Sequence, residues 1–299
     1  MLHLTVGVFG DTRFASHLGK LGTTNDIAIY HHSSSEAVLT IVHPASEKVQ
    51  PLLQSINMID VPILVVDQLT KEVGEAIIAI DQMKFSHGFI IGNEDLIRPI
   101  IKNTSLEKFT FTHEQAIRQQ LLNLNIQRDT NNLVIPIDNY FDVKSIGTVV
   151  LGIVKSGIAR QYEMVAVEPL GRAVTIKSMQ SQDKDVKEAE PGTRLGLSLK
   201  GISVDELKRG YVICKKMKNS TDVNIDFTKS NFFKSELKVS MAVFLNVGLQ
   251  VVPAHIQSID NHLVLKCLQP VVYDEGQKCI VASQSDVLPR IIGSGTLIM

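Results

Sequence analysis

The sequence lacks long apolar runs. No uninterrupted apolar stretch in its 299 residues approaches the roughly 20 residues that a transmembrane helix needs. The first residues form a short apolar run that meets Gly10 and Asp11 at once. This start has neither the basic region nor the small-residue cleavage site of a signal peptide. We therefore expect a cytoplasmic protein without a secretory leader and without contact to a membrane.

Cysteine and excess charge are also scarce. The three cysteines, Cys214, Cys267 and Cys279, form no CxxC pair, and neither they nor the histidines show zinc-ligand spacing. We expect buried thiols and no metal site. The formal net charge of −1 excludes a generally basic nucleic-acid coat protein, although a local basic face is compatible with it. An apolar fraction of 44% and a charged fraction of 20% exclude a disordered chain or a coiled coil.

Residues 1–130 alternate between apolar runs and amphipathic segments. The apolar runs predict buried strands, and residues spaced three and four apart predict helices, one of them with Ser46 as its N-cap. Near-continuous apolar strands that alternate with helices are typical of a parallel sheet covered on both faces. The expected strands are 4–9, 37–42, 62–66 and 89–92, and the expected helices are 47–57, 72–83 and 112–123.

After residue 130 the pattern becomes all-β. Short β-rich runs recur at intervals of about 8–12 residues and are separated by turn residues, which is typical of β-barrels. We place the second boundary at the polar segment 218–220. The prediction is an α/β domain over 1–130, a β-barrel over 131–218 and a second β-barrel over 219–299. The middle segment holds 14 Lys and Arg against 10 Asp and Glu, so it is the part best suited to an anionic partner.

Four segments of the middle part carry a resemblance to a known family. They are 141–157, 177–181, 189–201 and 205–210. The first resembles the opening of the second domain of translational GTPases such as elongation factor Tu, and the others resemble the end of that domain. Within that family the chain is most similar to the SelB-type branch, and more narrowly to the archaeal SelB-like factor linked with pyrrolysine. The resemblance implies a P-loop GTPase-like α/β domain followed by barrels like domains 2 and 3 of elongation factor Tu.

The phosphate loop departs from the family pattern. A working loop reads GxxxxGK followed by Ser or Thr, because its amides cradle phosphates, Lys neutralises them and the hydroxyl holds magnesium. Gly10 is kept, but Ala15, Ser16 and His17 stand at the positions of the second Gly, the Lys and the hydroxyl residue. Asp11 adds a negative charge to the loop. Loss of one charge-assisted contact alone costs about 1.5–3 kcal/mol. We therefore expect that the loop does not bind a triphosphate tightly.

The other nucleotide elements are altered as well. The segment 42–46, where the family's DxxGH element belongs, contains neither Asp nor Gly. In the guanine-reading NKxD element Asn93 is kept, Glu94 replaces Lys and Leu96 replaces Asp, while Asp95 lies one place early. An Asn-Glu-Asp sequence after a strand is also a common helix start. The sequence therefore predicts a degenerate GTPase domain without catalytic residues or a cofactor. Weak binding of GTP or GDP by the surviving fold is left open.

In this family the second domain and the first hold the aminoacyl group of a charged tRNA between them. The resemblance places Arg194 at that pocket, where its planar fork suits a polar or anionic group. A salt bridge within the barrel is the alternative interpretation. Candidate phosphate contacts are Lys144, Lys155, Arg160, Lys177 and Lys184, each of which is equally compatible with an ordinary solvated side chain.

The leading hypothesis from the sequence is a SelB-like translation elongation factor homologue that does not hydrolyse GTP. We expect a monomer that binds tRNA, aminoacyl-tRNA or another translation component, with the ribosome as a further candidate partner. One alternative is an active GTP-binding factor with a divergent phosphate site, based on the strand, Gly10 and a following helix whose N-terminus could hold an anion. Another alternative is a regulatory protein that contacts the ribosome or another factor through its barrels.

Overall fold

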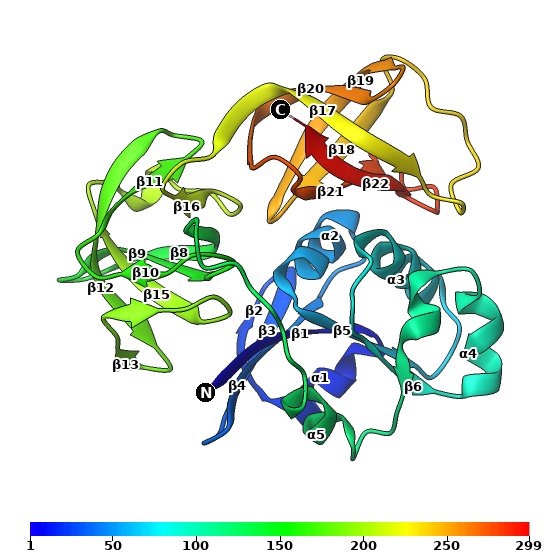
Figure 1. Ribbon diagram of the computed structural model, residues 1–299, viewed down its shortest axis with the longest axis horizontal. Helices are drawn as coiled ribbons and strands as arrows, with labels where there is room; N and C mark the ends of the chain where they lie inside the picture. Colours follow the sequence, from blue (N-terminus) through cyan, green and yellow to red (C-terminus); the bar gives the residue numbers. More distant parts are fainter. Residues whose placement is uncertain (299) are drawn as a thin grey trace.

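The computed structural model describes residues 1–298 and has three domains that all contact one another (Figure 1). The first is a mixed α/β sheet domain, and each of the others is a six-stranded β-barrel. This confirms the fold class predicted from the sequence. Nowhere in the described part of the chain does a helix have the length and apolar character needed to cross a bilayer.

The first domain is built on a seven-stranded sheet. Its strands lie in the order β2-β3-β4-β1-β5-β6-β7, and the pairs from β4 to β7 are parallel, while β2 and β3 pair antiparallel. The core strands are the apolar runs expected from the sequence, because only such runs can be buried on both faces. The bounds are β1 (Leu2–Gly10), β2 (Lys20–Thr24), β3 (Ile27–Ser33), β4 (Ala37–Pro44), β5 (Val61–Val66), β6 (Phe89–Gly92) and β7 (Thr110–Phe111).

Helices cover both faces of this sheet. The helices α2 (Val49–Met58), α3 (Lys71–Met83) and α4 (Glu94–Ile101) bury their apolar stripes in one cluster, while α1 (Ala15–Leu18) and α5 (Ile117–Leu122) pack in a second cluster. The helix expected over 112–123 is shorter than predicted. Ser46 is not an N-cap, because α2 begins after Lys48 and no side chain caps it.

The segment after the phosphate loop is a β-hairpin. β2 and β3 pair antiparallel, with a register shift between Leu21 and Thr23. β3 in turn pairs with β4 along its whole length. The histidines His31 and His32, which lack any metal-binding spacing, therefore lie on a strand and not in a flexible loop.

The middle barrel closes through pairing of β11 with β12. Its ring is β11-β16-β8-β9-β15-β12, with β13 added beside β12, and β10 pairs separately with β14. Each predicted β-rich run of this segment contributes to a strand. The bounds are β8 (Val134–Val143), β9 (Gly147–Ile153), β10 (Ala159–Arg160), β11 (Met164–Glu168), β12 (Arg172–Ser181), β13 (Lys184–Asp185), β14 (Glu188–Ala189), β15 (Arg194–Lys200) and β16 (Val212–Cys214).

The third domain is a closed barrel in the order β17-β20-β19-β18-β21-β22. Its first strand begins at Lys218. The three cysteines are free and buried, and burial raises the pKa of each thiol to about 12. The bounds are β17 (Lys218–Lys229), β18 (Ala242–Val247), β19 (Gln250–Ile259), β20 (Leu263–Tyr273), β21 (Lys278–Ser283) and β22 (Ile291–Ile298).

Candidate functional site

The phosphate loop is closed by hydrogen bonds within the protein. Gly10 has a φ of 84°, and a Cβ there would lie 2.0 Å from the carbonyl oxygen of Val65. The amide of Asp11 donates to that same oxygen at 2.9 Å. The amides of Arg13 and Phe14 donate to the carboxylate and the carbonyl of Asp11, at 3.1 and 3.4 Å. These three amides are therefore already bonded to protein acceptors and are not free to bind an anion.

Charge within the loop is also satisfied internally. The guanidinium of Arg13 donates from Nε to the Asp11 carboxylate at 2.8 Å and also reaches Asp67 at 3.3 Å. Its hydrogen bond holds the pKa of Asp11 below the ordinary value. Arg13 therefore pairs with carboxylates of its own domain rather than with an added anion.

The helix after the loop is too short to present a helix N-terminus to an anion. α1 has four residues, follows a 3-10 turn over Thr12–Phe14 and gives way to β2 at Lys20. Arg118 of α5 donates to the carbonyl oxygens of His17 and Leu18, at 2.7 and 3.2 Å, and so fixes the end of α1. The helix that the active-GTPase alternative relies on is thus reduced to a single turn.

The three loop residues that depart from the family pattern have structural contacts. Ala15 is fully buried, together with Phe14 and Leu18, in the core beneath the loop. The hydroxyl of Ser16 donates to the Arg13 carbonyl at 2.9 Å. The Nδ1 of the exposed His17 lies 3.6 Å from the Oε2 of Glu114. None of these contacts leaves a side chain directed at a phosphate position.

Asn93, the one conserved residue of the guanine element, acts as a helix cap. Its side-chain oxygen accepts from the amides of Asp95 and Leu96, at 3.0 and 3.4 Å, at the start of α4. This confirms the helix-start interpretation of the Asn-Glu-Asp sequence. Asp95 is exposed in the first turn of α4, where its charge suits the positive end of the helix dipole.

A cavity of about 390 Å³ lies beside the loop, between α2, α3 and the third barrel. Phe9, Leu52 and Ala76 supply apolar lining, and Glu47, Glu72 and Glu75 bring carboxylates to it. His43 also lines it, and its Nδ1 donates to the Pro44 carbonyl at 3.0 Å. Burial lowers the pKa of His43. Lys48 and Arg290 line it too, and Arg290 is paired with Glu75, so the carboxylates outnumber the cations by one.

Arg194 forms a buried ion pair. Its two terminal nitrogens both donate to the carboxylate of Asp138, one of them at 2.9 Å, and the side chains are only 8% and 5% exposed. The cavity that both residues line has a volume of about 20 Å³. In this conformation Arg194 is paired within the barrel, as the alternative interpretation expected, although it is buried. An aminoacyl contact there stays a prediction that requires the pair to open.

The candidate RNA contacts separate into two groups. Lys144, Lys177 and Lys184 are exposed, and no ion-pair partner is found for them among the described residues. Arg160 is paired with Glu188 at 3.1 Å. Lys155 donates to the carbonyl oxygen of Met58 at 2.7 Å, at the end of α2, and burial lowers its pKa. Lys155 therefore connects the middle barrel to the first domain.

Helix α2 is held by both barrels. Gln54 donates to the Leu249 carbonyl at 2.9 Å, and Asn57 donates to the side chain of Asn246 at 2.6 Å. Arg209 of the middle barrel donates to Asp26 at 2.6 Å and lies 3.4 Å from Gln54. One apolar cluster also runs from α2 and α3 into both barrels. These contacts hold the three domains in one arrangement.

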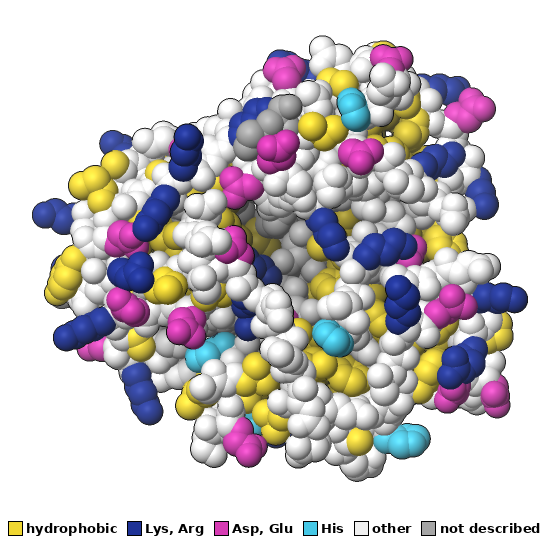
Figure 2. Space-filling view, viewed as in Figure 1, with side chains coloured by type: hydrophobic (Ala, Val, Ile, Leu, Met, Phe, Trp, Pro, Cys, Tyr) yellow, Lys and Arg dark blue, Asp and Glu magenta, His cyan; other side chains and the backbone are white. Residues whose placement is uncertain are grey.

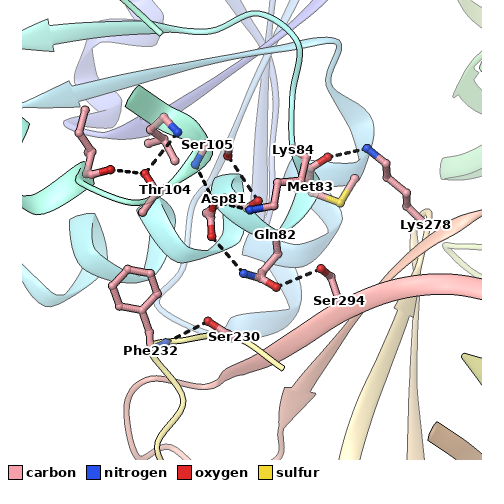
Figure 3. Close-up of polar contacts among 12 residues, drawn as sticks. Asp81, Gln82, Met83, Lys84, Thr104, Ser105, Ser230, Phe232, Lys278 and Ser294 are labelled. Atoms are coloured by element: carbon pink, nitrogen blue, oxygen red, sulfur yellow. Dashed lines mark hydrogen bonds and ion pairs between the residues drawn. The ribbon is translucent and has the colours of Figure 1, made fainter. Parts of the chain in front are cut away.

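The end of α3 makes a second seam with the third barrel (Figure 3). The buried carboxylate of Asp81 accepts from the amide of Ser105 and from Lys84, both at 2.7 Å. Gln82 connects this network to Ser294 of β22 at 3.0 Å, and Lys278 donates to the carbonyl of Met83 at 2.8 Å. The sequence carried no signal for these interdomain pairs, because the partners are about 200 residues apart.

Sequence comparisons identify relatives over nearly the whole chain. Residues 147–214 match the family described as Elongation factor Tu domain 2. The uncharacterized protein MJ0325 of Methanocaldococcus jannaschii is 35% identical over 307 residues, which cover 98% of this chain and 99% of that protein. The selenocysteine-specific elongation factor of the same organism is 26% identical over 337 residues, covering 93% of this chain and 72% of that factor.

Solved structures share the fold. SelB from Methanococcus maripaludis, in complex with the GTP analogue GppNHp, aligns with a TM-score of 0.83 at 20% identity and covers 100% of this chain and 79% of that one. Bacterial EF-Sec, a selenocysteine-specific elongation factor, aligns with a TM-score of 0.82 at 20% identity, over 99% and 58% of the two chains. At this identity the likeness establishes the three-domain architecture.

Proposed function

The chain belongs to the SelB-like branch of the translational GTPase family, and we propose that it works in translation as an RNA-binding factor without a GTP cycle. Its ligand in this proposal is tRNA or aminoacyl-tRNA. The first domain serves as a scaffold that fixes the two barrels, and the barrels contact the RNA.

One observation supports the proposed loss of the GTP cycle. The amides of Asp11, Arg13 and Phe14 already donate to protein acceptors, and the helix that follows them has four residues. A phosphate cradle needs free amides at the start of a helix. Of the two cations that line the cavity beside the loop, Lys48 and Arg290, the second is already paired with Glu75. The proposal therefore treats the nucleotide site as closed rather than merely weakened.

The RNA side of the proposal is supported by the middle barrel. This segment matches the family of elongation factor Tu domain 2 and has a local excess of positive charge. Exposed lysines release counterions when they meet phosphates, so tRNA affinity should fall steeply with salt. The resemblance to the archaeal factor linked with pyrrolysine makes pyrrolysyl-tRNA one of the charged species to compare.

Two titrations test the proposal. Isothermal titration of GTP and GDP with magnesium should give no binding near a micromolar dissociation constant, about −8 kcal/mol. Filter binding at about 50 mM salt should detect uncharged tRNA, bulk aminoacyl-tRNA or pyrrolysyl-tRNA, with affinity decreasing across a salt series. Tight GTP binding would refute the closed site and favour an active factor. Absence of tRNA binding, with retention on purified ribosomes, would favour the regulatory alternative.

A further inference from the structure

Two large apolar side chains of the middle barrel are turned to solvent. Tyr162 is 73% exposed and Met164 is 72% exposed, at the start of β11. Most other large apolar residues of this barrel lie in its core. Tyr162 and Met164 are part of neither the phosphate loop, nor the Arg194 cavity, nor the seams between domains.

The backbone at Tyr162 is in an unfavourable conformation. Its φ is 68°, in the left-handed region that suits glycine. The conformation is fixed, because the amide of Tyr162 donates to the Ile176 carbonyl at 2.7 Å and the amide of Glu163 closes the turn onto Arg160 at 3.3 Å. Within residues 1–298 the Tyr162 side chain makes no hydrogen bond, ring–ring contact or cation–π contact. Packing within the chain therefore does not explain a tyrosine at a position where glycine would relieve the strain.

Two free lysines flank Tyr162. Because Met164 pairs with Thr175 in antiparallel register, Lys177 lies level with Tyr162. Gln161 donates to the carbonyl of Lys177 at 3.1 Å and to that of Lys187 at 2.9 Å, which places both lysines next to the turn. Both are exposed, and neither has an ion-pair partner in the part of the chain that the structure describes.

The acidic groups near the turn are already neutralised. Glu163 is paired with Lys215 at 2.6 Å, and Glu188 is paired with Arg160 at 3.1 Å. The unpaired charge next to the exposed ring is therefore positive. The rim of the middle barrel, at the left of Figure 2, carries hydrophobic and Lys or Arg side chains close together, with Asp or Glu side chains among them.

We propose that Tyr162 and Met164 form a stacking platform for an unpaired nucleotide of a bound RNA, with its phosphates held by Lys177 and Lys187. Proteins that bind single-stranded nucleic acids present exposed aromatic rings beside cationic side chains, because every base has a face that can stack on such a ring. Protein interfaces are depleted in lysine, which disfavours a protein partner here. The inference rests on the proposed RNA binding and assigns one contact site to it.

The substitution Tyr162→Gly separates this role from a structural one. It removes the ring and the strain together, so we expect a higher thermal midpoint and a loss of affinity for unfractionated tRNA of roughly tenfold or more. Tyr162→Phe keeps the aromatic face and should retain the affinity. Lys177→Gln should reduce the slope of log affinity against log salt by roughly 0.7 to 0.9. Leu268→Ala, at a 62% exposed apolar residue of the third barrel, is the matched control and should change neither quantity.

A direct readout is ultraviolet crosslinking of wild-type protein to tRNA, with the crosslinked peptide expected to contain Tyr162. If the wild-type protein binds tRNA but Tyr162→Gly binds equally well, the platform is refuted and the proposed function stands. If the wild-type protein binds no tRNA, the proposed function itself fails. If tRNA affinity is kept while a protein of the purified ribosome is lost from a pull-down with Tyr162→Gly, the surface belongs to a protein partner and the inference is overturned.

Discussion

Arg290 of the third barrel and Glu75 of α3 form a buried ion pair that joins the third domain to the first. The Arg290 Nε donates to Glu75 Oε1 at 2.9 Å, and its terminal nitrogen donates to the other carboxylate oxygen. The two side chains are 13% and 5% exposed, and the same guanidinium donates to the carbonyl of Glu47 at 2.9 Å. Removing one partner of such a pair leaves the other charge buried and uncompensated.

Arg290→Ala should therefore lower the free energy of unfolding by about 3–5 kcal/mol, measured by urea denaturation. The matched control is Lys266→Ala. Lys266 pairs with Asp222 at 2.8 Å, but both side chains are more than half exposed, so its loss should cost less than about 1 kcal/mol. Equal effects of the two substitutions would mean that the seam between α3 and the third barrel contributes little to stability.

The pair of Arg194 and Asp138 gives a test of the aminoacyl pocket. Arg194→Met leaves the Asp138 carboxylate buried without its partner and should cost about 3–5 kcal/mol, whereas Arg194→Met combined with Asp138→Leu should recover most of that loss. The stable double variant can then be titrated with charged and uncharged tRNA. Loss of a preference for the charged form would support the pocket role of Arg194. An unchanged preference would limit Arg194 to the ion pair.

Restoring the phosphate-loop sequence should not restore nucleotide binding. The triple variant Ala15→Gly, Ser16→Lys and His17→Thr recreates the GxxxxGKT pattern from Gly10. However, the amide of Asp11 would still donate to Val65, and α1 would still have one turn. We expect no GTP binding near a micromolar dissociation constant by calorimetry, and a lower thermal midpoint because Ala15 is buried. Micromolar binding by the triple variant would show that side chains alone had disabled the loop.

The sequence predicted the elements whose signal is local. Buried strands such as Val61–Val66 are continuous apolar runs, and the barrel strands alternate with clear turn residues. The hairpin of β2 and β3 was missed because β2 is polar and exposed, so its pairing with β3 leaves no apolar pattern. α5 was predicted too long because the residues before Ile117 form a turn instead of helix, in which the amide of Ala116 donates to the His113 carbonyl at 3.0 Å.

The residues at 15–17 could be compared with the family pattern from the sequence, and a degenerate phosphate site there stays a prediction. The partners that satisfy the site could not be predicted, because Asp138 lies 56 residues before Arg194 and Arg290 lies 215 residues after Glu75. Likewise, the backbone strain at Tyr162 exists only in the folded turn, so the sequence marked that residue merely as the start of a strand.

Acid should destabilise the protein in a window set by buried histidines. Burial is the main cause that lowers the pKa of His3, His31 and His43 from 6.5, so the folded state binds fewer protons than the unfolded chain below that pH. The stabilising contribution of each neutral histidine is fully present above about pH 6.5. It decreases as the pH falls toward the pKa of the folded state, by at most about 1.4 kcal/mol of unfolding free energy per pH unit for each group. His43→Gln should therefore shrink the difference between urea midpoints at pH 7.5 and 5.5.

Carboxylates titrate at lower pH than these histidines, so the two contributions to the pH dependence of stability can be measured separately. The hydrogen bond from Arg172 lowers the pKa of Glu206 from 4.5 to about 2, so its stabilising contribution is present above about 4.5 and is lost as the pH falls toward 2. Glu206→Gln is thus the matched control for His43→Gln, since it should leave the difference between pH 7.5 and 5.5 unchanged. If His43→Gln also leaves that difference unchanged, His43 does not contribute to the acid sensitivity, which must then come from the other histidines whose pKa is lowered, His3, His31 or His32.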